Sequence, residues 1–239
     1  MSELAQRNQA AFAELCRTGT YTEEQRHAAH VVRFFRTVLS SVLPRMRRRQ
    51  SPRVLDAGMG TGAWLEELVS LFGDAGLEPT YYGFDFTPDM VSVARRRMAR
   101  LGVPADLAQG DLADAAGYRF GGVDRFDLIV VFDVVQQLPR PRQQTAVDRV
   151  LKALAPGGVA VIFDQDRFSR FGLKMEFRKA VTRFLRVPLV PAYFTLARYP
   201  ALGRIAARAR GQGFGVETRT MSDGPKRALV ITRPGIGTA

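Results

Sequence analysis

Residues 54–62 place Asp56 and three alternating glycines, Gly58, Gly60 and Gly62, directly after a short apolar run. Glycine lacks a Cβ, so the backbone at these positions can adopt positive φ and approach a ligand closely. The helix expected directly after this turn would point its N-terminus at the same ligand. The carboxylate could accept hydrogen bonds from a cationic amine, directly or through water. The segment therefore predicts a nucleoside site that also receives a positively charged group.

The same glycines fit part of a second pattern. Gly58, Gly60 and Ala63 match the looser form of the dinucleotide-binding fingerprint. Asp56 argues against that ligand, because its carboxylate would lie close to where a pyrophosphate belongs. A ligand with an ammonium and a sugar fits better, and a dinucleotide-dependent enzyme is the alternative.

Further segments support the first interpretation. The acid-x-Gly-x-Gly-x-Gly pattern over 56–62 resembles the first motif of the class I S-adenosylmethionine-dependent methyltransferases. Strand 81–85 ends on Asp85, and the resemblance implies that this carboxylate accepts hydrogen bonds from both ribose hydroxyls. Segment 109–112 resembles the adenine motif, in which Asp111 accepts from the exocyclic amine between apolar neighbours. The cofactor-binding residues that the resemblance implies are Asp56, Gly58, Gly60, Gly62, Asp85, Phe86, Gly110, Asp111, Leu112 and Phe132.

The resemblance also defines the expected fold. Segment 126–139 resembles the fourth strand and the loop that borders the transferred methyl group, and 151–163 resembles the helix, Pro-Gly-Gly turn and fifth strand. The last two strands would lie over 214–221 and 227–233. The strand runs are continuously apolar, as is typical of strands buried on both faces. We expect an α/β fold with a Rossmann-like, doubly wound, mostly parallel seven-stranded sheet and an antiparallel C-terminal strand.

The 239 residues suffice for one such unit. We divide them into an N-terminal helical cover over 1–50, a cofactor-binding core over 51–166, a helical lid over 167–212 and a C-terminal strand pair over 213–239. A single cysteine excludes an internal disulfide, and no apolar run approaches the roughly 20 residues of a transmembrane helix. The N-terminus lacks the apolar core of a signal peptide, so we expect a cytoplasmic protein.

The formal net charge of +12 raises the question of a nucleic-acid partner. Arginines cluster over 45–49 and over 95–100, the second group at the end of a predicted helix. Cations in a last helical turn complement the helix dipole, which explains that cluster without RNA. Because no RNA-binding appendage accompanies the core, we consider a nucleic-acid partner the weaker interpretation.

The segment 167–186 interleaves aromatic and basic residues. Three interpretations fit it: an amphipathic helix packed on the sheet, a lid over an apolar substrate that includes Phe168 and Phe171, or a helix docked on an anionic membrane surface. The predicted N-terminal helix over 25–43 would cover the site from above. It carries His27 and His30 one turn apart, and Tyr21 precedes it as a candidate polar contact to substrate.

Methyl transfer is an in-line displacement at a sulfonium carbon, so the enzyme must mainly hold a nucleophile close, aligned and dry. Many relatives in the resembled family carry a histidine in the loop after the fourth strand, where this chain has Gln136 and Gln137. Neither amide can accept a proton at neutral pH. A base would then come from elsewhere, or the acceptor would be an amine, an acidic phenol or a stabilised carbanion that needs little help. The candidate bases are His27, His30 and Asp133.

Carboxylates follow the predicted fourth and fifth strands, at the carboxyl ends where doubly wound sheets bind ligands. Asp164 and Asp166, with the two glutamines of the loop, are predicted substrate contacts. Nothing in the spacing requires magnesium, and two histidines are too few for a metal site, so we predict no metal.

These observations predict transfer of a methyl group from S-adenosylmethionine to an oxygen, nitrogen or carbon of a small, fairly apolar metabolite in natural-product metabolism. The product would be S-adenosylhomocysteine. Two alternatives stay open: an RNA methyltransferase that uses the arginine clusters, and a non-methylating S-adenosylmethionine-binding enzyme, such as a cyclase, on the same fold.

Overall fold

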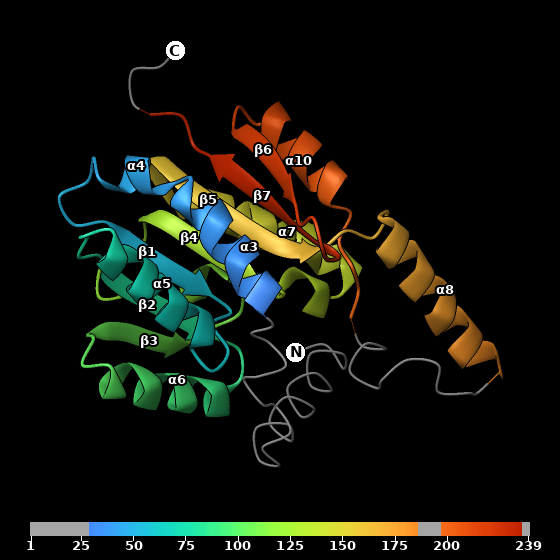
Figure 1. Ribbon diagram of the computed structural model, residues 1–239, viewed down its shortest axis with the longest axis horizontal. Coiled ribbons are helices and arrows are strands. Elements are labelled where there is room, and N and C mark those ends of the chain that lie inside the picture. The colour runs from blue at the N-terminus through green and yellow to red at the C-terminus, as the bar shows by residue number, and fades with distance from the viewer. Residues whose placement is uncertain (1–28, 186–196, 236–239) are drawn as a thin grey trace.

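A seven-stranded sheet forms the centre of the computed structural model, which describes residues 29–185 and 197–235. The strands lie in the order β3-β2-β1-β4-β5-β7-β6 (Figure 1). Strands β1 to β5 are mutually parallel, and β7 is antiparallel to both of its neighbours. The bounds are Arg53–Ala57 (β1), Thr80–Asp85 (β2), Ala105–Gln109 (β3), Phe126–Phe132 (β4), Leu154–Gln165 (β5), Gly215–Thr220 (β6) and Lys226–Thr232 (β7). The predicted fold class is confirmed.

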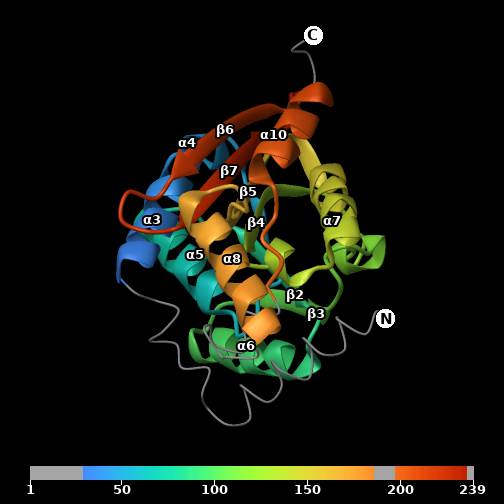
Figure 2. The same cartoon turned by 90° about the vertical axis from the view of Figure 1, so that its right-hand side faces the viewer.

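Helices cover both faces of the sheet (Figures 1 and 2). One face carries α3 (Ala29–Ser40), α5 (Ala63–Asp74) and α6 (Pro88–Arg100), and the other carries α7 (Arg140–Lys152) and α10 (Leu202–Gly211). The remaining helical elements are α4 (Leu43–Met46), the 3-10 turns η1 (Ala115–Tyr118) and η2 (Val135–Gln137), and α8 (Arg170–Leu185). Within the described residues no helix is long and apolar enough to cross a membrane.

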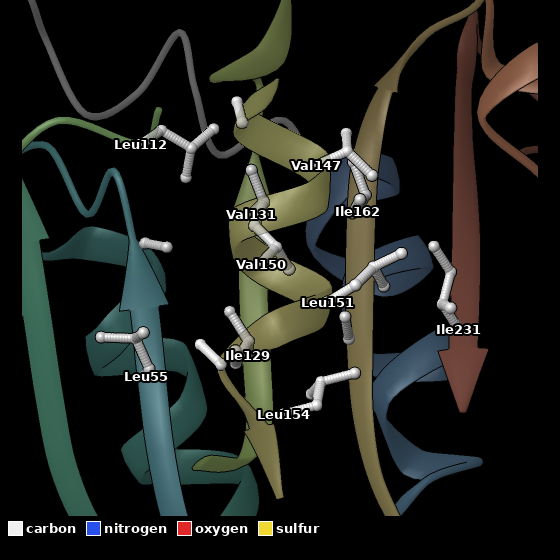
Figure 3. Packing of buried hydrophobic residues seen from close by; sticks show 14 of the residues in the cluster. Leu55, Leu112, Ile129, Val131, Val147, Val150, Leu151, Leu154, Ile162 and Ile231 are labelled. Atoms are coloured by element: carbon white, nitrogen blue, oxygen red, sulfur yellow. The ribbon is translucent and has the colours of Figure 1, made fainter. Parts of the chain in front are cut away.

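The core lies in two layers because successive side chains of a strand point to opposite faces. In β4 all seven residues are buried. Ile129 and Val131 pack with Val147 and Val150 of α7 on one face (Figure 3). Residues of the opposite parity pack beneath α3 and α5, where Phe35 is completely buried. The continuous apolar run of this strand is therefore explained by burial on both faces.

The topology gathers polar residues at one edge. Parallel strands present all their carboxyl ends at the same side of a sheet, so the residues that end β1, β2, β4 and β5 lie along this edge. Because β7 runs antiparallel to β5, its first residues lie here as well, and Lys226 pairs in register with Gln165. We call this side the carboxyl edge; the amino edge is the opposite side.

Candidate active site

The glycine turn after β1 is held in shape by the neighbouring strand. All three glycines have positive φ: 85° at Gly58, 56° at Gly60 and 78° at Gly62. The amides of Gly58 and Met59 both donate to the carbonyl oxygen of Phe84, at 2.8 and 2.9 Å. A Cβ on Gly58 would lie only 2.4 Å from a methyl carbon of Val134, so the turn packs directly against the loop after β4. A larger residue would separate two parts of the edge that are in contact.

Asp85 is oriented by two backbone amides. Its Oδ2 accepts a hydrogen bond from the amide of Gly60 at 2.9 Å, and its Oδ1 accepts one from the amide of Thr87 at 2.9 Å. Each oxygen of a carboxylate can accept two hydrogen bonds. The side chain is partly exposed. It is thus fixed at the glycine turn and fits two vicinal hydroxyls.

The residues after β3 make more side-chain contacts within the protein than Asp85 does. Asp111 accepts from the amide of Ala113 through Oδ1, and its Oδ2 forms an ion pair with Arg142 of α7 at 2.9 Å. Leu112 is buried in the core, and its carbonyl accepts from the hydroxyl of Tyr118 at 2.8 Å. The ion pair with Arg142 was not anticipated, since nothing in the sequence connects these two positions.

The flanks of this segment are also fixed. Gly110 donates its amide to the carbonyl of Asp85 at 2.9 Å, and a Cβ there would lie 3.0 Å from the Cα of Gly117. Phe86 is half-buried, and its carbonyl accepts from the amide side chain of Gln109. These contacts bring the ends of β2 and β3 together at the carboxyl edge.

Aromatic side chains fill the space beside the turn. Phe132, the last residue of β4, stacks on Trp64 in the first turn of α5 with 4.0 Å between ring centroids. Phe35 of α3 and Phe163 of β5 also contact the Phe132 ring, with 5.9 and 5.3 Å between ring centroids. These four rings are buried. They form an apolar wall next to the glycine turn.

A charged cluster lies at the end of this wall. Asp133 follows Phe132 directly, and its Oδ2 forms an ion pair with Nζ of Lys226 at 2.5 Å. The ammonium of Lys226 also lies 4.8 Å from the centroid of the Phe132 ring. Lys226 is buried, and the sequence analysis missed it, because a lysine at the start of a late strand belongs to no motif.

Asp164 lies inside the protein. It is fully buried, and its oxygens accept from the amides of Gln136 at 3.0 Å and Gln165 at 2.7 Å. Burial raises the pKa of Asp164 well above its usual value, and the nearby Asp133 carboxylate raises it further. The geometry therefore shows that the Asp164 side chain holds the loop that carries Gln136 and Gln137. Its contact with substrate stays a prediction.

Asp166 connects three elements. Its Oδ1 accepts from the amides of Leu202 at 3.3 Å and Phe168 at 3.4 Å, and its Oδ2 pairs with Arg227. Phe168 is 53% exposed, with the guanidinium of Arg204 5.9 Å from its ring centroid. These contacts place Asp166 in the framework that joins α8 and α10 to β7.

The remaining predicted side chains are placed as follows. Phe171 is half-buried and meets Tyr199 edge-on, with 6.3 Å between centroids. His30 is half-buried in the first turn of α3. His27 and Tyr21 lie outside the described residues. Within 29–185 and 197–235, no three His, Cys, Asp or Glu residues are grouped in a way that could hold a metal ion.

A cavity of about 710 Å³ lies at the amino edge, between η1, the end of α7 and the end of α10. Its lining includes Arg119, Arg149 and Arg233. None of the predicted site residues lines it, so its position differs from that of the glycine turn.

The fold and the carboxyl edge define a class of ligand-binding α/β protein. A doubly wound sheet with a glycine turn at the point where the strand order reverses, between β1 and β4, is the arrangement of a nucleotide- or nucleoside-binding α/β protein. Residues 54–158 match the family described as a methyltransferase domain. This match agrees with the predicted resemblance to the class I S-adenosylmethionine-dependent methyltransferases. Comparison with curated proteins gives no match.

Solved structures share this fold. Magnesium protoporphyrin IX methyltransferase from Synechocystis PCC 6803, with bound S-adenosylhomocysteine, superposes with a TM-score of 0.61 at 16% identity, over 86% of this chain and 84% of that chain. An O-methyltransferase family protein from Burkholderia thailandensis gives a TM-score of 0.60 at 16% identity, over 97% and 71%. Mitomycin 7-O-methyltransferase gives 0.55 at 17% identity, over 93% and 60%. At these identities the likeness supports the fold.

Proposed function

We propose that the protein transfers the methyl group of S-adenosylmethionine to an oxygen, nitrogen or carbon of a small, fairly apolar molecule. The observation that carries this proposal is the contact between two parts of the carboxyl edge: the glycine turn braced by Asp85, and the loop after β4 that continues from an aromatic wall. Gly58 and Val134 join them. A nucleoside held at the first part would present its sulfonium toward the second.

Each part of the cofactor has a suitable partner. Asp85 would accept hydrogen bonds from the two ribose hydroxyls, because a backbone amide orients each of its oxygens at the glycine turn. Gly58, Gly60 and Gly62 would allow the backbone to approach the nucleoside. Asp56, at the end of β1, would attract the ammonium of the methionine part. Asp111 would accept from the adenine amine, with Gly110 and Leu112 beside the ring and Phe86 and Phe132 lining the apolar parts of the site.

The cofactor supplies an activated methyl group when it is bound. The protein then has to align a nucleophile and exclude water, since the displacement proceeds in line. The buried rings of Phe35, Trp64 and Phe132 would help to exclude water from this side of the site. The backbone amide of Gln136 is held by buried Asp164, which fixes the loop without any need for a histidine there.

Natural-product metabolism is the setting that we favour. Several structures with the same fold carry names from such chemistry, among them mitomycin 7-O-methyltransferase, the citrinin polyketide synthase CMeT domain and a protein of echinomycin biosynthesis. The buried aromatic wall supports an apolar acceptor on independent grounds.

Calorimetric titration with S-adenosylhomocysteine, and separately with NADH, tests the cofactor site. We expect S-adenosylhomocysteine alone to bind, and Asp85→Asn to weaken its binding about tenfold to hundredfold, as for loss of a charged hydrogen bond. Asp89→Asn is the matched control, because Asp89 is exposed in the first turn of α6 and should leave binding unchanged. Binding of NADH in place of S-adenosylhomocysteine would mean a dinucleotide enzyme.

The RNA alternative receives less support from the arginines. Arg49 pairs with Asp127 at 3.2 Å, and buried Arg97 pairs with Glu66 at 2.5 Å and donates to the carbonyl of Thr61. These side chains have structural partners within the protein. Catalysed transfer of a tritiated methyl group to bulk tRNA, with none to extracted metabolites, would favour the RNA enzyme. Cofactor binding without any S-adenosylhomocysteine formation in the presence of the true ligand would favour the non-methylating alternative.

A further inference from the structure

Asp133 has an unusual backbone conformation. Its φ is 58°, and it is the one residue other than glycine with positive φ in the described part of the chain. Aspartate tolerates this region better than most residues, but the conformation still costs free energy. Such strain persists where the surroundings impose it, and it is concentrated at functional sites. Here the amide of Asp133 is held by the carbonyl of Phe163 at 2.9 Å.

The side chain of Asp133 is paired through one oxygen only. Oδ2 lies 2.5 Å from Nζ of Lys226, whereas Oδ1 is buried and has no hydrogen-bond partner within residues 29–185 and 197–235. A buried acceptor without a partner is unfavourable. The side chain as a whole is 28% exposed, so part of Asp133 borders accessible space.

Because Lys226 pairs with Oδ2 of Asp133, Oδ1 is the carboxylate oxygen that has no partner within the described residues. The buried ammonium pairs with the Asp133 carboxylate and lies over the Phe132 ring, and the buried Asp164 interacts electrostatically with both Asp133 and Lys226. The ion pair holds the Asp133 carboxylate in one orientation, at the end of the aromatic wall and beside Val134, which packs against the glycine turn. A hydrogen-bond donor at Oδ1 would complete the cluster.

We propose that Oδ1 of Asp133 receives the hydrogen of the methyl acceptor, a hydroxyl or an amine, and that Lys226 is the positioning residue for this carboxylate. This rests on the proposed function. As the acceptor atom's electron pair forms a bond to the methyl carbon, the carbon–sulfur bond breaks and its electrons stay on sulfur. The acceptor's O–H or N–H becomes strongly acidic in the same step, and its proton moves to Asp133. A carboxylate is a sufficient base for a group whose acidity rises in this way.

Sinefungin, a nonreactive analogue of the cofactor with an aminated carbon in place of the methylated sulfur, tests this without knowledge of the acceptor. Its amine occupies the place of the transferred methyl group. We expect it to bind about tenfold or more tightly than S-adenosylhomocysteine, because the amine would donate a charged hydrogen bond to Asp133. Asp133→Asn should remove this preference while S-adenosylhomocysteine binding stays unchanged, and Asp106→Asn, an exposed position on β3, should keep it.

Lys226 is tested by two further variants. Lys226→Met should reduce the sinefungin preference because the carboxylate is no longer oriented, and Lys226→Arg should restore most of it. The inference is overturned if wild type shows no preference, or if Asp133→Asn keeps it. Failure of every variant and of wild type to bind S-adenosylhomocysteine would instead contradict the proposed function.

A separate observation concerns the outer face of α8. Leu173, Phe177 and Phe184 are 55%, 70% and 86% exposed, and their spacing of four and seven residues puts them on one stripe. The inner face already has its contacts: Met175 is buried, and the ammonium of Lys179 donates to the carbonyl of Ala197 at 2.9 Å. In Figure 1 the helix projects from the body of the protein beyond the carboxyl edge.

A row of cations flanks this apolar stripe. Arg170, Lys174 and Arg178 follow one another at four-residue spacing, and all three are exposed. Exposed aromatics beside a cationic row are the pattern of a helix that lies in the headgroup region of an anionic bilayer. A second copy of the same surface would bring like charges together, which disfavours self-association. The geometry points to an anionic lipid surface as the partner of this face, which would bring an apolar acceptor toward the carboxyl edge.

Co-sedimentation with phosphatidylcholine vesicles, with and without phosphatidylserine, tests the membrane surface. We expect binding that requires phosphatidylserine, falls with salt, and drops about tenfold or more in Phe177→Ser/Phe184→Ser or Arg170→Glu/Lys174→Glu. Leu101→Ser and Arg45→Glu/Arg48→Glu are controls at other exposed positions. Unchanged binding in the α8 variants, or a dimer in gel filtration that the phenylalanine variants dissociate, would overturn this inference.

Discussion

At the ends of β1 and β2 the carboxyl edge is built mainly from backbone, whereas at the ends of β4, β5 and β7 it is built from charged side chains. In the first region the amides of Gly58, Gly60 and Thr87 make the decisive contacts. In the second, Asp133 and Lys226 are paired at 93 residues' separation. The first region is stabilised by conformation and close packing, so added volume should damage it. The second is stabilised by balanced charges, so removal of one partner should damage it.

Gly58→Ala should produce the largest change. The new Cβ would meet Val134 at 2.4 Å while the backbone keeps a φ of 85°. Positive φ costs a non-glycine residue roughly 1–2 kcal/mol, and overpacking costs about 1–3 kcal/mol, so we expect a loss of about 2–5 kcal/mol in unfolding free energy. Urea denaturation measures it.

The double variant Gly58→Ala/Val134→Ala separates the two causes. Relative to Val134→Ala alone, the double variant should lose only the free energy that the positive φ costs alanine, because the overpacking against Val134 is relieved. If the double variant regains none of the unfolding free energy that Gly58→Ala loses, the contact between the glycine turn and the loop after β4 does not limit the space at Gly58.

Lys226→Met tests the second region by removing a charge, whereas Gly58→Ala tests the first by adding volume. It leaves the Asp133 carboxylate beside buried Asp164 without a cation, and we expect a loss of about 2 kcal/mol, less than for a fully buried pair because Asp133 is 28% exposed. Asp133→Asn in the same chain should recover much of the loss. A coupling below about 0.5 kcal/mol in this double-mutant cycle would contradict a functioning ion pair.

Asp164→Asn should change how stability depends on pH. Burial raises the pKa of Asp164, so above the ordinary value of about 3.9 the native state holds a proton that the unfolded chain has lost. The contribution of this group to stability therefore falls as pH rises from about 4 toward the raised pKa, by up to about 1.4 kcal/mol per pH unit. The free energy of unfolding of the variant minus that of wild type should increase over this range.

Denaturation at a series of pH values from 4 to 8 checks this difference. Asp148→Asn, at a partly exposed position on α7, is the control. A difference that stays constant with pH would mean that Asp164 titrates in the native protein much as it does in the unfolded chain.

The same contrast explains what the sequence could predict. The turn over 56–62 and the acid at Asp85 are contiguous signals, because glycine conformations and strand ends are local properties of the chain. The continuously apolar strand runs likewise predicted a sheet buried on both faces, and the resemblance implied its antiparallel last strand. Lys226 was missed because its neighbours come from β4 and β5, and only the antiparallel direction of β7 brings it to the carboxyl edge. The full burial of Asp164 was not predicted, since spacing shows that a strand ends but not which side chain turns inward.

Arg142→Ala should have the smallest effect, and it examines the ion pair between Arg142 and Asp111 in the cofactor half. Arg142 and Asp111 are 36% and 22% exposed, so the pair should contribute less than about 1 kcal/mol to stability. If Asp111 accepts from the adenine amine, the guanidinium competes for the same oxygens. Its removal should then tighten S-adenosylhomocysteine binding about two- to fivefold, since one hydrogen bond to a better acceptor is worth about 0.5–1 kcal/mol.

Arg140→Ala is the matched control, because Arg140 lies two residues earlier on α7 and pairs with Glu176 of α8 instead. It should leave S-adenosylhomocysteine binding unchanged. Weaker binding in Arg142→Ala would show that the guanidinium positions Asp111 for the ligand. The cofactor half would then depend on a charged pair, as the half around Lys226 does. Within the cofactor half, only the glycine turn would still be stabilised mainly by backbone conformation and close packing.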